Sequence, residues 1–337
     1  MNEQKQLGRQ TYFLPTGPVV LANANVVGKK EGEGPLSDTF DLINPDNTFG
    51  EKTWEQAERT MQKLALKQAL AKAQKTPEDV DLLFAGDLLN QCISSGYAAR
   101  DLGLPYFGLY GACSTMAESL ALAAMALDGG FGSCAAAVAS SHFCTAERQY
   151  RTPLEYGGQR TPTAQWTATA AGCVLLGKEG PGPRVTHVTV GRIQDKGVTD
   201  PSNMGAAMTW AAYDTISAHL RETGRSSSYY DLIVTGDLGQ LGHDLLLELF
   251  RQEGTDLSGN YEDCGCILYD REVQDVQCGA SGCGCSASVL TGRLLRGMAD
   301  GTWKRLLFCA TGALHSPVAL GQGESIPGIC HAVALEL

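Results

Sequence analysis

Short apolar runs alternate with amphipathic stretches along the first half of this 337-residue chain. Helical spacing of apolar positions predicts a helix after Thr53, which would cap it, with Gln56 completing a capping box. The aromatic run at 105–110 predicts a buried strand, and the alanine run at 135–139 predicts a crowded central strand. Together the runs favour an α/β fold whose first strands lie at 18–24, 81–88, 105–110, 135–139 and 173–176.

The same order of runs begins again after the Gly-Pro-Gly-Pro break at 180–183. The run at 231–238 repeats the pattern of 81–88, 150 residues further along the chain. A repeat of this length is typical of a duplicated domain, so we expect a first half at residues 1–180 and a second half at residues 181–337. The remaining runs of the second half predict strands at 185–190, 306–312 and 330–335 and helices at 206–220 and after 281.

Charge and composition narrow the classes of function. The formal net charge of −11 argues against nucleic acid and against a broadly basic membrane-binding surface. No apolar run approaches the roughly 18 residues that span a bilayer, and the polar start has no signal-peptide core, so we expect synthesis in a cytosol. The 12 cysteines are scattered, which favours free thiols. The Cys-Gly-Cys pairs at 264–266 and 283–285 lack the usual zinc spacing, so we expect no resident metal.

The stretch at 111–120 joins a small-residue turn to a helical pattern, and Cys113 stands at its start. A strand, a tight turn and a helix in this order would place Cys113 at a helix N-terminus. Free amide groups and the helix dipole there would stabilise a thiolate or a bound anion. A small apolar cysteine packed where a helix meets a sheet is the alternative, and the spacing leaves both open.

Several longer strings carry a family resemblance over nearly the whole chain. They are Leu-Phe-Ala-Gly-Asp-Leu-Leu-Asn-Gln at 83–91, Gly-Ala-Cys-Ser at 111–114, Ser-Ser-His at 140–142, Thr-Ala-Glu-Arg-Gln at 145–149, Glu-Tyr-Gly-Gly-Gln at 155–159 and Ala-Thr-Gly-Ala-Leu at 310–314. With these strings the sequence resembles the stage V sporulation protein AD family, the thiolase-like members of the operon for dipicolinic acid uptake into bacterial spores.

The resemblance implies both a fold and a role. The fold would be thiolase-like α/β, with duplicated βαβαβαββ halves packed about a pseudo-dyad as five αβαβα layers. The role would be to bind dipicolinic acid at the periphery of the spore inner membrane, together with integral membrane proteins of the same operon. Thiolase-like folds usually dimerise, so a homodimer is expected by analogy.

The resemblance to a thiolase does not by itself imply an enzyme. Acyl-transferring relatives pair the nucleophilic cysteine with a histidine and an asparagine, or two histidines, from the second half. Here the corresponding segments are Thr-Gly-Asp-Leu-Gly-Gln at 235–240 and Gly-Cys-Gly-Cys-Ser at 282–286, with neither residue type. We therefore expect a binding protein. The alternatives are a Cys113 acyltransferase with His315 as its base and a purely structural subunit of the membrane complex.

A ligand pocket would form where strands of an α/β sheet end. We expect it to use Asp87, Asn90, Cys113, Ser114, Ser141, His142, Arg148, Gly312 and His315. Asp87 would accept a proton from the ring nitrogen of dipicolinate or help to hold Ca²⁺ carried with the ligand; a turn-capping role is the alternative.

The polar segment at 142–166 is the predicted source of positive charge. It contains Arg148, Arg151 and Arg160 against two glutamates, and arginine suits carboxylate ligands. We expect this segment to cover the pocket and Arg148 to form its cationic wall, with a solvated loop as the alternative.

Overall fold

The structure is a computed structural model that describes residues 5–150 and 160–337. The first half forms a sheet in the order β5 (Tyr106–Leu109), β4 (Leu82–Gly86), β6 (Cys134–Ser141), β8 (Ala170–Gly177) and β2 (Val19–Val27). Strand β4 runs parallel to β5 and β6, whereas β8 runs antiparallel to β6 and β2. The alanine run lies in β6, a fully buried central strand, as predicted.

The second half repeats this sheet strand by strand. Its order is β11 (Tyr261–Asp263), β10 (Leu232–Thr235), β13 (Arg305–Ala313), β14 (Gly328–Glu336) and β9 (Arg184–Thr189), with the same strand directions. Val19 of β2 pairs with Arg184 of β9, so the two sheets join. The boundary at residue 180 stays a prediction. Four short strands lie outside this order, namely β1 (Thr11–Phe13), β3 (Leu42–Ile43), β7 (Trp166–Thr167) and β12 (Ala280–Ser281).

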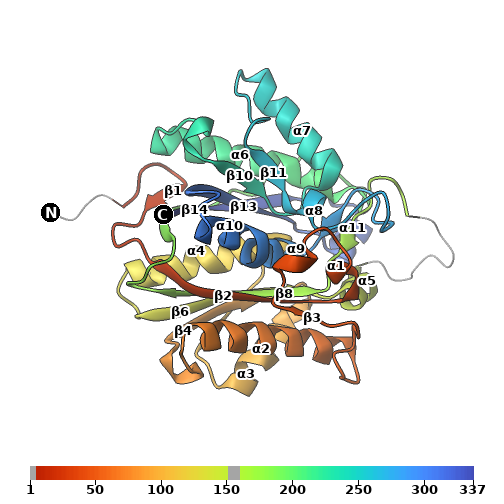
Figure 1. Cartoon of the computed structure of the whole chain (residues 1–337). Helices are drawn as coiled ribbons and strands as arrows, with labels where there is room; N and C mark the ends of the chain where they lie inside the picture. Colours follow the sequence, from red (N-terminus) through yellow and green to blue (C-terminus); the bar gives the residue numbers. More distant parts are fainter. Residues whose placement is uncertain (1–4, 151–159) are drawn as a thin grey trace.

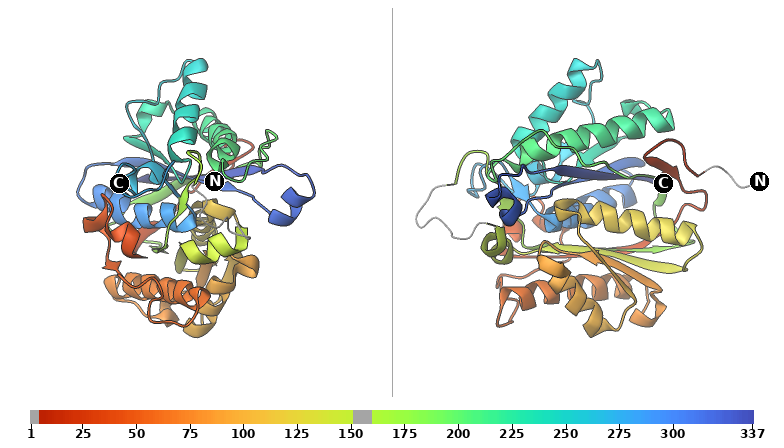
Figure 2. Two further views of the ribbon diagram at one scale, coloured as in Figure 1. Left: turned by 90° about the vertical axis from the view of Figure 1, so that its right-hand side faces the viewer. Right: turned by 180° about the vertical axis from the view of Figure 1, so that it is seen from behind.

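Helices complete the predicted five layers (Figure 1). Helices α2 (Trp54–Lys72) and α3 (Ile93–Leu102) cover the outer face of the first sheet. Helices α6 (Met204–Thr223) and α7 (Gly239–Gln252) cover the outer face of the second. Between the sheets lie α4 (Thr115–Asp128), α9 (Cys283–Val289) and α10 (Leu295–Ala299). The remaining short helices are α1 (Lys29–Gly32), α5 (Phe143–Tyr150), α8 (Cys264–Ile267) and α11 (Pro317–Gly321), the last of which projects sideways in Figure 2.

The middle layer supplies a core that both halves share. Met116 and Leu120 of α4 pack in one cluster with Leu290 and Phe308 of the second half, and all four are fully buried. Burial of such a side chain stabilises the fold by about 1.5–3 kcal/mol relative to an exposed position. The largest core cluster therefore belongs to the whole chain and not to either half.

Two local expectations differ from the structure. The aromatic run forms β5, but it lies at the end of the sheet, and Phe107 is 54% exposed. The prediction of a buried strand is wrong because hydrophobic content does not reveal strand order. Thr53 caps α2 by accepting a hydrogen bond from the Gln56 amide at 3.3 Å, but the Gln56 side-chain oxygen has no hydrogen-bond partner among the described residues. The capping box is therefore only half formed.

Candidate functional site

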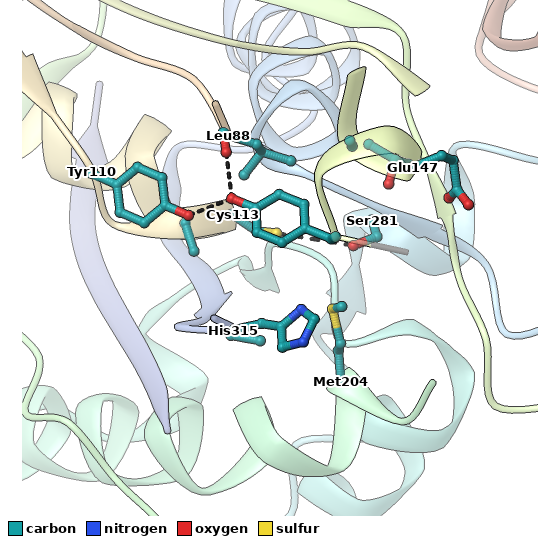
Figure 3. A pocket seen from close by; sticks show the side chains of 12 residues that line it. Leu88, Tyr110, Cys113, Glu147, Met204, Ser281 and His315 are labelled. Carbon is teal, nitrogen blue, oxygen red and sulfur yellow. Dashed lines mark hydrogen bonds between the residues drawn. The ribbon is translucent and has the colours of Figure 1, made fainter. Parts of the chain in front are cut away.

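A cavity of about 30 Å³ lies where the two halves meet beside Cys113 (Figure 3). The first half contributes Cys113 and the aromatic and acidic side chains Tyr110, Glu147 and Tyr150, and the second half contributes Ser281 and His315. The volume is enough for about two water molecules. Any larger ligand therefore requires the lining side chains to move.

Cys113 stands at the start of α4, as the small-residue turn predicts. A single 3-10 turn, Ala112–Ser114, precedes the helix. Gly312 of β13 is needed for this turn to pack, because a Cβ atom there would lie 2.4 Å from the Gly111 carbonyl oxygen and 3.2 Å from the Cys113 amide nitrogen. Gly312 thus permits the close approach of the second half to the cysteine.

The Cys113 thiol lies in a setting that disfavours a thiolate. Burial and the neighbouring Asp237 carboxylate raise the pKa of this thiol well above its usual value. Its sulfur lies 3.9 Å from the Ser281 hydroxyl, the contact drawn as a dashed line in Figure 3. Of the two alternatives left by the sequence, the structure supports the packed, protonated cysteine.

Sequence reasoning missed Asp237, which lies behind Ser281, as well as the lining residues Tyr110, Glu147, Tyr150 and Ser281. The Asp237 carboxylate accepts hydrogen bonds from the Thr311 hydroxyl at 2.9 Å, the Gly282 amide at 2.9 Å and the Ser281 hydroxyl at 3.2 Å. Burial raises the pKa of Asp237 to about 7. The signal was present, because Asp237 follows β10 as Asp87, a predicted site residue, follows β4.

Asp87, the corresponding residue of the first half, is buried and does not line the cavity. Its carboxylate accepts hydrogen bonds from the Leu89 amide at 2.9 Å and from the amide and hydroxyl of Ser95 at 2.8 and 2.6 Å. These bonds hold the connection from β4 to α3. The geometry matches the turn-capping alternative.

Glu58 lies close to Asp87 in the same buried network. The hydroxyls of Ser140 and Thr145 donate to its carboxylate at 2.9 and 3.0 Å. Burial, and then the charge of Asp87, raise the pKa of Glu58 to about 8. The first half therefore holds a proton at this carboxylate pair near neutral pH.

Four further predicted residues do not line the cavity, and three of them use their side chains to support the backbone. The Ser141 hydroxyl donates to the Ala168 carbonyl at 2.7 Å, and the Ser114 hydroxyl donates to the Gly111 carbonyl at 2.7 Å. Nδ1 of His142 accepts from the Cys144 amide at 3.1 Å, so Nε2 carries the proton that it donates to a main-chain oxygen. Asn90 donates its backbone amide to the Gln149 side chain at 3.0 Å.

His315 does line the cavity, facing Tyr150 with ring centroids 5.6 Å apart. The Tyr150 hydroxyl donates to the Leu88 carbonyl and also contacts the Tyr110 hydroxyl. Figure 3 draws both interactions as dashed lines beside the labelled Leu88 and Tyr110. These two tyrosines connect the Cys113 turn, α5 and the end of β4. Together with His315 they form part of the cavity wall.

The arginines of segment 142–166 lie in three different situations. Arg148 forms an ion pair with Glu55 of α2 and is not among the residues that line the cavity. Arg160 forms a 3.1 Å ion pair with Glu147, which does line it. Arg151 lies outside the described residues. Helix α5 covers one side of the cavity, so the segment contributes to its wall.

The described residues offer no separate metal centre. Among them, no group of three or more histidine, cysteine, aspartate or glutamate side chains is arranged to hold a metal ion. In the same part of the chain, no helix is long and apolar enough to cross a bilayer.

Comparison with solved structures identifies the architecture. The chain is similar to 3-oxoacyl-[acyl-carrier-protein] synthase III from Aquifex aeolicus VF5, with a TM-score of 0.60 and 13% identity over 95% of this chain and 100% of that one. It is also similar to Xanthomonas campestris OleA with bound lauric acid and lauroyl-CoA, with a TM-score of 0.62 and 13% identity over 95% and 99% of the two chains. At this identity the likeness shows the thiolase-like fold alone.

Sequence comparisons are more specific. The chain is 41% identical over 332 residues to stage V sporulation protein AD of Bacillus subtilis (strain 168), covering 98% of each chain. The family model described as stage V sporulation protein AD matches residues 8–336. The strings at 83–91, 111–114 and 310–314 fall within that match. The chain therefore belongs to the stage V sporulation protein AD family.

Proposed function

We propose that this protein binds dipicolinic acid in the cavity beside Cys113 and supports its uptake into the developing spore. The observation that carries the proposal is a cavity between the two halves that is lined by the buried Cys113 and by Ser281, whose hydroxyl donates a hydrogen bond to the Asp237 carboxylate behind it at 3.2 Å. Such a site can enclose a ligand, but it cannot readily form a thioester. Membership of the stage V sporulation protein AD family supports the choice of dipicolinic acid as the ligand.

The charge of the ligand must be balanced inside this cavity. Dipicolinate has two carboxylates, whereas Glu147 lines the cavity and Asp237 lies behind it. With the pKa of Asp237 at about 7, part of its population is neutral at physiological pH, which reduces repulsion. Uptake as the neutral calcium chelate would reduce it further, so we propose that Ca²⁺ arrives with the ligand and is not a resident cofactor.

The proposal includes a movement of Tyr150 away from the Leu88 carbonyl, because a cavity of about 30 Å³ is too small for a ring with two carboxylates. The Tyr110 and Tyr150 hydroxyls and the His315 ring would then be available as hydrogen-bond groups for the ligand carboxylates. The freed Leu88 carbonyl would become exposed to solvent or to the bound species.

Calorimetric titration with dipicolinate, with and without Ca²⁺, tests the proposal. We expect saturable binding that Ala313→Leu weakens at least about tenfold, since this change fills the cavity wall. Ala319→Leu in α11 adds the same side chain outside the cavity and should leave binding within about twofold. Absence of binding by the folded wild-type protein would support a purely structural subunit instead.

The proposed setting is the periphery of the spore inner membrane, with integral membrane proteins of the same operon as partners. Family membership supports this part of the proposal. Flotation with spore inner-membrane vesicles tests it: the protein should float with vesicles that contain those partners and stay behind with lipid alone. Equal flotation with lipid alone would assign the contact to the bilayer.

A further inference from the structure

Helix α5 forms one wall of the cavity of the proposed function and is held from two sides. Gln149 and Tyr150 both donate hydrogen bonds to the Leu88 carbonyl, the first at 2.9 Å. On the other side, the Thr145 hydroxyl lies 3.0 Å from Oε2 of Glu58 on α2. Because two side chains of α5 share the Leu88 carbonyl, the release of this contact calls for a movement of the whole eight-residue helix, which also moves Thr145.

Glu58 belongs to a buried network of polar side chains. Its Oε1 accepts a hydrogen bond from the Ser140 hydroxyl at 2.9 Å. Gln62 donates from Nε2 to the hydroxyls of Ser140 and Ser95 at 2.7 and 2.8 Å, and the Ser95 hydroxyl donates to Asp87 at 2.6 Å. All five side chains are buried. The network therefore links the carboxyl groups of Glu58 and Asp87.

The hydrogen bonds place the proton of this pair on Glu58. Asp87 accepts from two main-chain amides and from the Ser95 hydroxyl, a setting that suits a carboxylate. Oε2 of Glu58 faces the Thr145 hydroxyl, which also lies 2.9 Å from the His142 carbonyl. One hydroxyl proton cannot serve both oxygens. As a carboxylic acid, Glu58 donates to Thr145, and the Thr145 hydroxyl then donates to the carbonyl, so both contacts form.

The groups that face Glu58 also favour the carboxylic acid while α5 is in place. From the elements packed against α2, the described residues contribute one anion and four uncharged groups: Asp87, Ser140, Thr145, His142 and Cys283. Burial lowers the pKa of His142 and raises the pKa of the Cys283 thiol well above its usual value, which leaves both neutral. Burial and the charge of Asp87 raise the pKa of Glu58 to about 8.

We propose that the proton on Glu58 keeps α5 closed over the cavity, and that ligand entry moves α5, admits water to Glu58 and releases this proton to solvent. The inference rests on the proposed function, because it concerns how the same cavity opens. Once Thr145 has moved away and water reaches the carboxyl group, its pKa returns toward the ordinary value of 4.5. The closed form then holds a proton that the open form loses. Raising the pH between these two values therefore favours the open form and strengthens binding.

Calorimetric titration with dipicolinate, without Ca²⁺, counts the released protons. Titrations at pH 7 in HEPES and in Tris differ in heat by the number of protons that the buffer takes up. The wild-type protein should release close to one proton more per ligand than Glu58→Gln. From pH 6 to pH 7, its affinity should rise about three- to tenfold relative to that variant. Asp237 is present in both proteins, so its titration cancels in the comparison.

Two further variants make the comparison specific. Glu58→Met is uncharged and similar in volume, so it should behave like Glu58→Gln and replaces it if the glutamine variant does not fold. Glu55→Gln is the matched control, because Glu55 also joins α2 to α5, through its ion pair with Arg148, but its side chain is 31% exposed. This control should release as many protons as the wild type.

Hydrogen exchange of the α5 amides tests the closed form without a ligand. At pH 8, exchange in the wild type should be at least about threefold faster than in Glu58→Gln, with a smaller difference at pH 6. Equal exchange in the two proteins at both pH values would overturn the inference, whether or not dipicolinate binds. Equal proton release with binding intact would also overturn it and would leave the proposed function standing.

Discussion

At the scale of single residues, the Cys113 thiol determines whether this thiolase-like protein has acyl-transfer chemistry. Because burial and Asp237 hold it protonated, we expect no stable thioester after incubation with acyl-CoA. Intact-mass measurement should give the unmodified chain, and Cys113→Ser is the matched control. A stoichiometric adduct in the wild type that is absent from Cys113→Ser would establish the acyltransferase alternative.

Glu58 predicts a pH dependence of stability. Its pKa is raised from 4.5 to about 8, so over this range the folded state holds a proton that the unfolded state releases. Raising the pH through this window therefore favours the unfolded state. From about pH 6 to about pH 9, the wild-type protein should lose unfolding free energy on the order of 2–4 kcal/mol relative to Glu58→Gln.

Denaturant unfolding at the two pH values measures this difference. The glutamine variant should tolerate burial because both hydrogen-bond partners of Glu58 are hydroxyls, which can rotate to accept. Glu253→Gln on the exposed surface is the control and should follow the wild type. Parallel pH curves for the wild type and Glu58→Gln would show that Glu58 is ionised throughout.

Some of the candidate site could be predicted from single residues, and some could not. Cys113 and His315 line the cavity, and the small-residue turn pointed to the first of them. Asp87 and His142 do lie near strand ends, but their side chains turn inward to hold the backbone. Side-chain direction at a strand end depends on the following turn, which residue types alone do not fix.

At the scale of elements, the approach of β13 to the Cys113 turn predicts a requirement for glycine. A Cβ at Gly312 would clash with main-chain atoms, which cannot move as a flexible side chain can. Gly312→Ala should therefore cost about 1–3 kcal/mol of stability and weaken dipicolinate binding. Thermal unfolding measures the first effect, and Gly321→Ala, where no atom lies within 4 Å, is the control.

The order of the elements along the chain was more predictable than their positions within the sheets. The repeated runs identified all ten principal strands except β11, and the duplicated strand order follows the resemblance to thiolases. The exposed edge position of β5 was missed, because an aromatic run has the same composition in a buried strand and at an exposed edge. The order of strands within a sheet depends on contacts between distant segments, so no local sequence pattern reveals it.

At the scale of the whole molecule, we propose that a second copy of the chain pairs with the exposed edge of β5. Among the described residues β5 pairs with β4 alone, so its other side presents free backbone groups beside exposed Phe107 and Tyr110. Light scattering should give a homodimer, and Phe107→Glu should shift it toward monomer. Phe131→Glu, at a phenylalanine that is 79% exposed outside β5, should leave the mass unchanged. A monomeric wild type would contradict this proposal.

The shared core predicts that the two halves unfold together. Calorimetry should give one transition, because separating the halves would expose the inner faces of both sheets. Two resolved transitions would mean that each half is stable alone.

The middle layer also limits how this chain can change over generations. A duplication starts with two equal copies, each free to accumulate substitutions. Here Gly172 of β8 lies against Ala287 of α9, and Gly284 of α9 lies against the Ala170 carbonyl of β8, with room for no Cβ at either glycine. A larger residue in one copy is acceptable only with a compensating change in the other. At these contacts the two halves can therefore change only together, although their sequences differ.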